Sequence, residues 1–323
     1  MSHAKLSPSA AERWMTCPGS IVLSEGMPNK SSAFAEEGTC AHALAEACLL
    51  DGLPAQAFVG KEFEYEDHGE VKTVVIKQDM ADNTQVYLDA VTELPGKLHV
   101  EVKAAVNEHV YGTADAVVWD EETATLYVRD LKYGAGVAVE VHGNLQLKIY
   151  ALGALITMRY PAKVVDVGIC QPRCPHSDGP VRAVQFDVVD LLDFHADLED
   201  AVADVAVAKK WHNKDGWAEE WLKPSDKGCR WCLAAPKCPK LKSKAQELAK
   251  QAFAPGLPYD PAELAETLDF LPILEGWIKN TREFAYEQAE KGEAIPSWKL
   301  VEKRATRKWR GDESVVVNWL QEK

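Results

Sequence analysis

The chain has 323 residues, of which 46% are hydrophobic and 27% are charged, and its formal net charge is -14 at pH 7. This composition is typical of a globular chain with an ordinary core. It excludes a protein that coats nucleic acid over its whole surface, because phosphate binding depends on Lys and Arg. No apolar run reaches the roughly 18 residues of a membrane-spanning helix, and the first residues lack the apolar stretch of a secretory signal. We therefore expect a cytoplasmic protein.

The first quarter of the chain favours helices. Ser9 and Glu12 have the spacing of a capping box, which predicts a short helix that ends near Cys17. A second helix should end at Asp51-Gly52, since glycine commonly follows the last helical residue. The expected elements are a helix over 33–50, a hairpin within 61–79 and a helix over 78–94.

After Pro95-Gly96 the pattern changes to short strands. Residues alternate or are β-branched and apolar in three consecutive segments, and a helical stretch separates these from two further strands. The expected strands are 98–106, 112–119, 125–132, 164–170 and 181–186, with helices over 143–159, 190–210 and 261–292. The order helix, three strands, helix, strand predicts a mixed α/β fold in which helices cover the faces of one sheet.

The second and third predicted strands carry charged residues within apolar runs. Asp115 ends the run Gly-Thr-Ala-Asp at 112–115, and Asp130 and Lys132 flank Leu131. Residues two apart on a strand project from the same face, so Asp130 and Lys132 should lie together while Leu131 enters the core. Two neighbouring carboxylates repel unless a divalent cation lies between them, and oxygen ligands suit Mg²⁺ or Mn²⁺. The pattern is typical of metal-assisted phosphodiester hydrolysis, although an Asp-x-Lys alone is also common as a surface ion pair.

These motifs resemble a known family. The run at 112–115, then 130–132 and the pair Gln146-x-x-x-Tyr150 are similar to motif II, motif III and the Gln-x-x-x-Tyr motif of RecB-like nucleases in the PD-(D/E)XK superfamily. Residues 37–42 (Glu-Gly-Thr-Cys-Ala-His) resemble the first motif. The resemblance implies a restriction-endonuclease-like αβββαβ core and a metal-dependent DNA nuclease. The expected activity is that of an exonuclease in recombination, repair or replication, similar to small stand-alone phage and prophage enzymes.

The resemblance also assigns roles to the motif residues. It implies that a Mg²⁺ or Mn²⁺ ion is bound by His42, Asp115, Asp130 and the carbonyl of Leu131. Lys132 becomes the catalytic lysine, and the catalytic set is completed by Gln146 and Tyr150, which would line the site and contact the nucleic-acid backbone. Asp130 stands where many members of the family carry Glu, and Glu37 and Glu101 are further candidates for outer ligands.

The eight cysteines include one spacing typical of metal binding. Cys229, Cys232 and Cys238 form Cys-x-x-Cys-x5-Cys, and Cys17 is the natural fourth ligand. The arrangement resembles the [4Fe-4S] site of AddB-type helicase-nucleases and of RecB-like exonucleases of CRISPR adaptation. It implies a structural iron-sulfur cluster that joins residue 17 to 229–238, with zinc as the alternative. The other four cysteines lack this spacing and are expected to be buried or free thiols.

Two basic stretches, 227–244 and 299–310, are interleaved with tryptophans. Such stretches suit single-stranded DNA, although solvated surface segments and core tryptophans are equally ordinary. The predicted DNA-contact residues are Arg304, Arg307, Lys308 and Trp309. We expect a nuclease domain over 1–250, in which the iron-sulfur cluster joins residue 17 to 229–238, and a helical region with a basic tail over 251–323. The alternatives are a non-catalytic nucleic-acid-binding subunit that keeps the fold, and a hydrolase directed at RNA.

Overall fold

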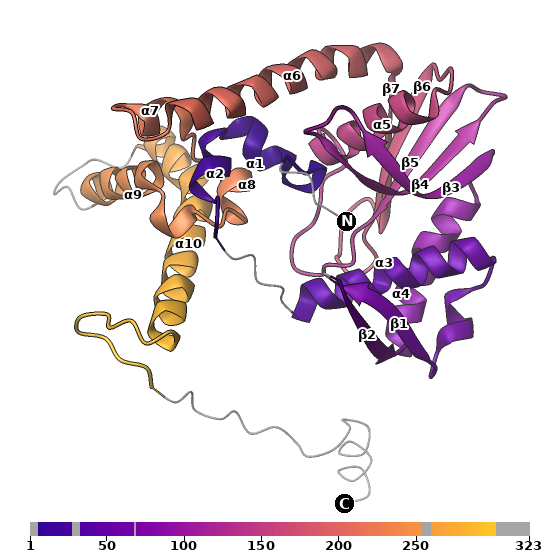
Figure 1. Ribbon diagram of the computed structural model, residues 1–323, viewed down its shortest axis with the longest axis horizontal. Helices are drawn as coiled ribbons and strands as arrows, with labels where there is room; N and C mark the ends of the chain where they lie inside the picture. The colour runs from indigo at the N-terminus through magenta and orange to yellow at the C-terminus, as the bar shows by residue number, and fades with distance from the viewer. Residues whose placement is uncertain (1–5, 28–32, 68, 253–259, 302–323) are drawn as a thin grey trace, which may run out of the picture.

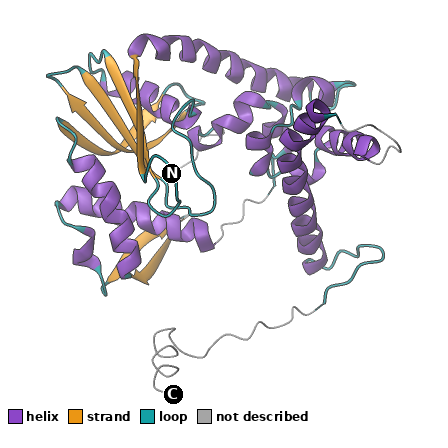
Figure 2. Ribbon diagram, turned by 180° about the vertical axis from the view of Figure 1, so that it is seen from behind, coloured by secondary structure: helices purple, strands orange, loops and turns teal. Residues whose placement is uncertain are grey.

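The computed structural model describes residues 6–27, 33–67, 69–252 and 260–301. All strands lie in one half of the molecule and helices alone make up the other half (Figure 2). The long helix α6 (Val188–Trp211) begins directly after the last strand and runs across to the helical half (Figure 1). Within the described residues, no helix combines the length and the apolar character needed to cross a membrane.

The main sheet has five strands in the order β3-β4-β5-β6-β7. The strands are β3 (Lys97–Ala105), β4 (Tyr111–Asp120), β5 (Thr125–Leu131), β6 (Val164–Cys170) and β7 (Val181–Asp187). All neighbouring pairs are antiparallel except β5 and β6, which are parallel. Parallel neighbours need a crossover connection, and helix α5 (Leu145–Met158) provides it. The sheet is therefore mixed, as the order of the predicted elements indicated.

Helix α5 lies close against β3 and β4 because it carries a glycine where the two backbones meet. A Cβ atom added at Gly153 would lie 2.7 Å from the carbonyl carbon of Ala104 and 2.9 Å from the amide nitrogen of Ala105. Both of these atoms belong to the backbone of β3, so neither can turn away as a side chain could. The glycine thus sets the distance between α5 and the sheet, and with it the position of the side chains at the start of α5.

We expect Gly153→Ala to lower the free energy of unfolding by about 1–3 kcal/mol, because the added methyl group overpacks a backbone contact. Gly276 is the matched control. It also lies inside a helix, α10 (Pro261–Glu290), but a Cβ there meets no atom within 4 Å. Gly276→Ala should stabilise the helix by up to about 1 kcal/mol. Urea denaturation of both variants measures the difference, and equal effects would contradict the close approach of α5.

A second layer packs against the opposite side of β5 and β6. It consists of α3 (Ala33–Asp51), α4 (Gln78–Thr92) and the hairpin of β1 (Glu62–Asp67) with β2 (Glu70–Val75). Leu44 of α3 and Leu88 of α4 belong to the same buried cluster as Leu131 and Cys170 of the sheet. Leu131 is thus a core residue, which agrees with the strand periodicity. The flanking Asp130 and Lys132 lie on the other face, toward α5.

The helical half is formed by segments from both ends of the described chain. Short turns and helices near the N-terminus meet those that follow α6, and their buried side chains include Cys17, Val22, Leu222, Cys238 and Leu241. The elements are η1 (Pro8–Ala10), α1 (Ala11–Thr16), α2 (Gly19–Leu23), α7 (Trp217–Trp221), α8 (Asp226–Arg230), η3 (Ala235–Lys237), α9 (Pro239–Ala252) and α10. Residue 17 therefore lies in the same unit as residues 229–238.

The predicted capping box at Ser9 is wrong. Ser9 lies inside the 3-10 turn η1, and α1 begins after it with Ala10 as its N-terminal flanking residue and no side-chain cap. Pro8 explains the difference, since proline fixes a backbone angle suited to the first position of a helical turn. The helical turn therefore begins at Pro8 and includes Ser9, which no longer occupies the extended conformation that a cap requires.

Candidate active site and cysteine cluster

The candidate site lies where β4 and β5 separate. Backbone pairing between the two strands ends at Ala116 and Arg129. Beyond this point, the Leu131 N–H donates to Oδ2 of Asp115 at 2.7 Å, in place of a β4 backbone carbonyl. The N–H and carbonyl of one strand residue project to the same side. The Leu131 carbonyl therefore projects toward the Asp115 side of β5, as the predicted role of this carbonyl requires.

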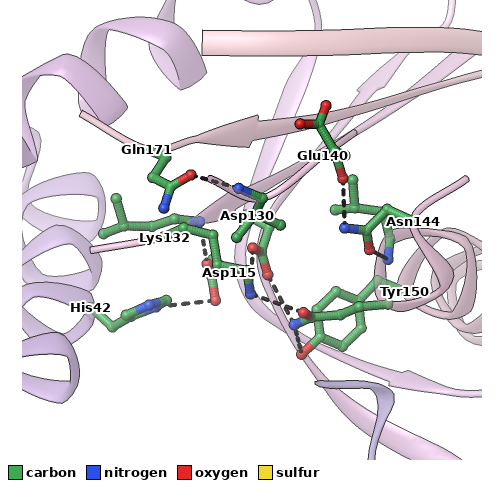
Figure 3. A network of polar contacts seen from close by, with 12 residues as sticks. His42, Asp115, Asp130, Lys132, Glu140, Asn144, Tyr150 and Gln171 are labelled. Atoms are coloured by element: carbon green, nitrogen blue, oxygen red, sulfur yellow. Dashed lines mark hydrogen bonds and ion pairs between the residues drawn. The ribbon is translucent and has the colours of Figure 1, made fainter. Parts of the chain in front are cut away.

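His42 approaches the same carboxylate from helix α3. Its Nδ1 lies 3.3 Å from Oδ1 of Asp115, and the imidazole is directed at that carboxylate (Figure 3). Burial alone would lower the pKa of His42, but the charge of Asp115 and the hydrogen bond to it outweigh burial and raise the pKa to about 9. Burial would likewise raise the pKa of Asp115, and His42 together with the Leu131 N–H holds it below its usual value. Without a metal ion the two groups form an ion pair.

Asp130 and Lys132 form a second pair, which a glutamine from α5 completes. Lys132 Nζ lies 2.8 Å from Oδ2 of Asp130 and donates to Oε1 of Gln146 at 2.9 Å. The amide nitrogen of Gln146 donates to Oδ1 of Asp130 at 3.2 Å and to the Tyr150 hydroxyl at 3.1 Å. Gln146 lies in the first turn of α5, which Asn144 caps by accepting from the Leu147 N–H at 3.1 Å. The cap therefore fixes where α5 begins, and this start places Gln146 next to Lys132.

The carboxylates of Asp115 and Asp130 lie in a buried environment, where the charge of one affects the pKa of the other. Asp130 is only 2% exposed, and burial raises its pKa, an effect that Lys132 opposes and the charge of Asp115 strengthens. An imidazole nitrogen, two carboxylates and a backbone carbonyl are ligands that Mg²⁺ or Mn²⁺ accepts, so the donor set fits a divalent cation. Across the described residues, no three His, Cys, Asp or Glu side chains are already grouped around one point as an ion would hold them. These side chains would have to turn toward a bound ion.

The glycine of the run at 112–115 has a packing role beside the site. A Cβ at Gly112 would lie 3.0 Å from Cγ of Pro8 and 3.1 Å from Cε1 of Tyr150. Gly112 therefore allows both the N-terminal turn η1 and the aromatic ring of α5 to approach β4. Because Gly112 has no side chain, α5 packs close to β4 and its Tyr150 reaches Gln146 at the site.

A buried glutamine that the sequence did not single out holds the loop after β5. Gln171 donates to the carbonyls of Gly134 and Val137, at 2.9 and 2.8 Å, and accepts from the Val139 N–H at 2.9 Å. Gln171 is 1% exposed and lies directly after β6 (Figure 3). The loop that follows Lys132 is thus fixed to the sheet, and it returns the chain to α5.

The four cysteines of the predicted cluster converge on one cavity. Cys17 ends α1, Cys229 lies in α8, and Cys232 and Cys238 precede and follow η3. All four line a small cavity whose other walls are largely apolar, with Leu222 and Leu241 among them. The structure therefore brings residue 17 together with 229–238, although the two segments are separated by the whole sheet in sequence.

Backbone amides are directed at two of these sulfur atoms. The Lys223 N–H donates to Sγ of Cys17 at 3.3 Å, and the Leu241 N–H donates to Sγ of Cys238 at 3.5 Å. Burial raises the pKa of Cys17, of Cys238 and of Cys229, the last to about 12, while these and other backbone hydrogen bonds act in the opposite direction. Thiolates in an apolar cavity need a metal centre as counter-charge, and amide hydrogen bonds to sulfur are a usual feature of iron-sulfur sites. The chemistry of the donor set fits a four-thiolate metal centre, toward which the thiols, not grouped around one point in the described structure, would have to turn.

Residues 3–323 match a family whose description reads "Protein of unknown function (DUF2800)". The chain belongs to the DUF2800 family. The match includes both the residues around Asp115 and Asp130 and all four cysteines of the cluster. The sheet half and the helical half of this DUF2800 chain are thus parts of one family pattern.

Other predicted residues of the DUF2800 chain lie elsewhere. Arg304, Arg307, Lys308 and Trp309 fall outside the described residues. In the basic stretch at 227–244, Lys240 forms an ion pair with Glu219, and Lys237 lies over the ring of Phe284. The side chains of Lys237 and Lys240 therefore already contact other residues of the protein.

The tryptophans beside the basic stretches differ in exposure. Trp217 is buried and donates to the carbonyl of Ala208 at 2.8 Å, so it is a core residue. Trp231 and Trp298 are 72% and 80% exposed. Stacking on a base requires a free ring face, so these two residues are better placed for a DNA contact than Trp217.

The two glutamates suggested as outer ligands have different positions. Glu37 forms an ion pair with Arg173 Nη1 at 2.7 Å and is not among the residues that line the cavity beside Asp115. Glu101 does line that cavity, together with Glu46 and Tyr87. Burial, then the charges of Asp115 and Glu46, raise the pKa of Glu101 to about 7. Glu46 follows His42 by one helical turn, and this i, i+4 spacing was the signal by which the sequence could have indicated it.

Proposed function

We propose that this DUF2800 chain is a Mg²⁺- or Mn²⁺-dependent DNA nuclease of the RecB-like branch of the PD-(D/E)XK superfamily, acting as an exonuclease. One observation carries the proposal: Lys132 is held between Asp130 and Gln146 at the point where Asp115 faces His42. Two acids and a lysine from neighbouring strands thus lie at one end of the sheet, with a histidine beside them. The strand and helix order of a restriction-endonuclease-like core supports the same assignment.

The residues of the site suit phosphodiester hydrolysis. His42, Asp115, Asp130 and the Leu131 carbonyl would hold the divalent cation, which when bound polarises the phosphate and lowers the pKa of a water molecule. The ammonium of Lys132 is the donor next to Asp130, where it orients the attacking water and offsets negative charge on the phosphate. Gln146 fixes the ammonium through its carbonyl oxygen and Asp130 through its amide nitrogen. The Tyr150 hydroxyl, which accepts from Gln146, limits the rotation of that amide.

The four cysteines are proposed to hold a [4Fe-4S] cluster with a structural role. The support is the common cavity of Cys17, Cys229, Cys232 and Cys238, its apolar walls and the amide hydrogen bonds to sulfur. Zinc is the alternative occupant, because it binds the same four thiolates. Metal analysis after anaerobic purification distinguishes about four iron atoms and four sulfides per chain from one zinc ion.

The decisive experiment is the digestion of end-labelled DNA by the full chain with Mn²⁺, with and without a chelator. We expect hydrolysis that the chelator abolishes, and we expect Asp130→Asn to reduce the rate by about 10³-fold, equivalent to about 4 kcal/mol of activation free energy. Asp200→Asn, an exposed carboxylate on α6, is the matched control and should retain the wild-type rate. Products of strands labelled at either end give the polarity.

Two outcomes of this assay would contradict the proposal. Intact DNA with every variant would favour a non-catalytic nucleic-acid-binding subunit that keeps the fold. Equal rates for wild type and Asp130→Asn would mean that the activity comes from another site or from a contaminant. A matched RNA substrate tests for the RNA-directed alternative in the same experiment.

A further inference from the structure

Helix α10 carries apolar side chains on two opposite faces. One face packs into the helical half, where Ile273 is buried and Trp277 packs against the same cluster. The other face carries large apolar side chains that are between 39% and 56% exposed, and they belong to Leu264, Leu268, Leu271, Ile278 and Tyr286. We call these five residues the outer stripe. The inward face explains how α10 is attached to the protein, but it does not explain why the outer stripe is apolar.

The outer stripe has the spacing of a seam between two paired helices. Leu264, Leu271 and Ile278 recur every seven residues, and Leu268 lies between the first two at a spacing of four and three. This is the a and d pattern of a helix that packs along a partner helix. At 3.6 residues per turn, the stripe occupies an arc of roughly 80° on a helix about 45 Å long. Its length and its narrow width favour a second helix over a small ligand.

Two charged residues of opposite sign lie within the outer stripe. Glu275 and Arg282 follow Leu268 by seven and fourteen residues, so they occupy the same position of the seam. Two helical turns, about 10 Å, separate them from each other. Both are exposed, and among the described residues neither has an ion-pair or hydrogen-bond partner. A charge at a seam position is stabilised by an opposite charge on the partner, so this pair restricts how a second helix can lie.

The order of these charges fits a second copy of α10 that runs antiparallel. In a parallel pair, Glu275 would meet the partner's Glu275 and Arg282 the partner's Arg282, so like charges would repel. In an antiparallel pair with its two-fold axis beside Ile278, Glu275 meets the partner's Arg282, and the symmetry repeats this contact. The same register sets Leu271 against the partner's Tyr286, so apolar residues meet as well. The outer stripe is therefore complementary to itself, as a two-fold interface requires.

We propose that the chain forms a homodimer in which the outer stripes of two α10 helices pack antiparallel. Burial of the apolar side chains provides the affinity, and the two Glu275–Arg282 pairs set the direction and the register. The inward face of α10 stays on the helical half, so the described fold does not have to change. The interface lies away from the strands that carry Asp115 and Asp130 (Figure 1). The inference is therefore independent of the proposed nuclease activity.

The test measures the mass of the full chain in solution by sedimentation velocity, at concentrations of about 1–100 µM. Wild type should sediment as a dimer at the upper end of this range. Leu271→Glu should weaken association by at least about 10-fold, because a charge enters the apolar seam. Leu192→Glu is the matched control, since Leu192 is an exposed leucine on α6, and it should associate as wild type does. A wild type that stays monomeric throughout, or equal association of the two variants, would overturn the proposal.

Exchange of the two charges tests the antiparallel register and leaves the apolar residues unchanged. Glu275→Arg and Arg282→Glu should each weaken dimerisation by about 10-fold, because each puts two like-charged pairs into the interface. The double variant has the same net charge as wild type and should regain the wild-type affinity. Circular dichroism verifies that each variant is folded. A double variant that associates as weakly as the single ones would refute the antiparallel pairing, and single variants that dimerise like wild type would exclude both residues from the interface.

Discussion

Replacement of Cys17 by serine is expected to abolish iron binding and to destabilise the helical half of the molecule. Cys17 shares a cavity with Cys229, Cys232 and Cys238, so a metal centre there joins the start of the chain to a segment beyond the sheet. Closure of a loop of this length removes about 5 kcal/mol of chain entropy from the unfolded state. Loss of the fourth thiolate should therefore lower the melting temperature by roughly 10 °C.

Cys174 provides the matched control, because it is buried to the same extent as Cys17, each being 8% exposed, and lies outside the cavity of the cluster. Cys174→Ser should keep the visible absorption of the purified protein and about four iron atoms per chain. Iron content, absorption and thermal denaturation are measured on both variants after anaerobic purification. A Cys17→Ser protein with full iron content and unchanged stability would exclude Cys17 as a ligand.

Replacement of Lys132 by methionine is expected to reduce DNA hydrolysis by about 10³-fold while Mn²⁺ binding is retained. Methionine keeps most of the length of the side chain but removes the ammonium that contacts Asp130 at 2.8 Å and Gln146 at 2.9 Å. The carboxylate loses its positive neighbour, so its attraction for a divalent cation is preserved or increased. Loss of rate without loss of metal would separate the role of Lys132 from that of the metal ligands.

The measurement compares single-turnover rates at saturating Mn²⁺ with Mn²⁺ affinity from dialysis. Lys103→Met is the control, since Lys103 is an exposed lysine on β3 of the same sheet. This variant should cleave DNA at the wild-type rate. If Lys132→Met cleaves as fast as Lys103→Met, the ammonium has no part in the reaction. If it loses both rate and metal, Lys132 acts only by maintaining the geometry of Asp130.

Most of the fold follows from local patterns in the sequence. Strands β4 and β5 were predicted to within one residue at each end, because continuous apolar segments bounded by turns are typical of buried strands. The two-residue period of a strand alone places Asp130 and Lys132 on one face, and both side chains do contact Gln146 of α5. The start of α1 was wrong because Pro8 and Ser9 favour different starting points for one helix, and the sequence does not show which is used.

The candidate site was predictable only in part. Asp115, Asp130 and Lys132 stand in recognisable runs, and the structure brings them together with His42 and Gln146. Glu101 and Tyr87 join the site through contacts between distant segments. The first depends on the register of β3 against β4 and on one left-handed residue, and the second on the packing of α4 against the sheet. No local pattern encodes such pairings, since they arise from the tertiary arrangement.

The position of the four cysteines has a consequence for the synthesis of the protein. The last strand of the main sheet ends at Asp187, whereas the final thiol of the cavity is Cys238. A chain growing on the ribosome can pair β3 through β7 before Cys229, Cys232 and Cys238 are synthesised. Until then, Cys17 lacks the other three thiols of the cavity. Insertion of the proposed metal centre would then be one of the last events of maturation, and it would join the N-terminal segment to the helical half after the sheet has formed.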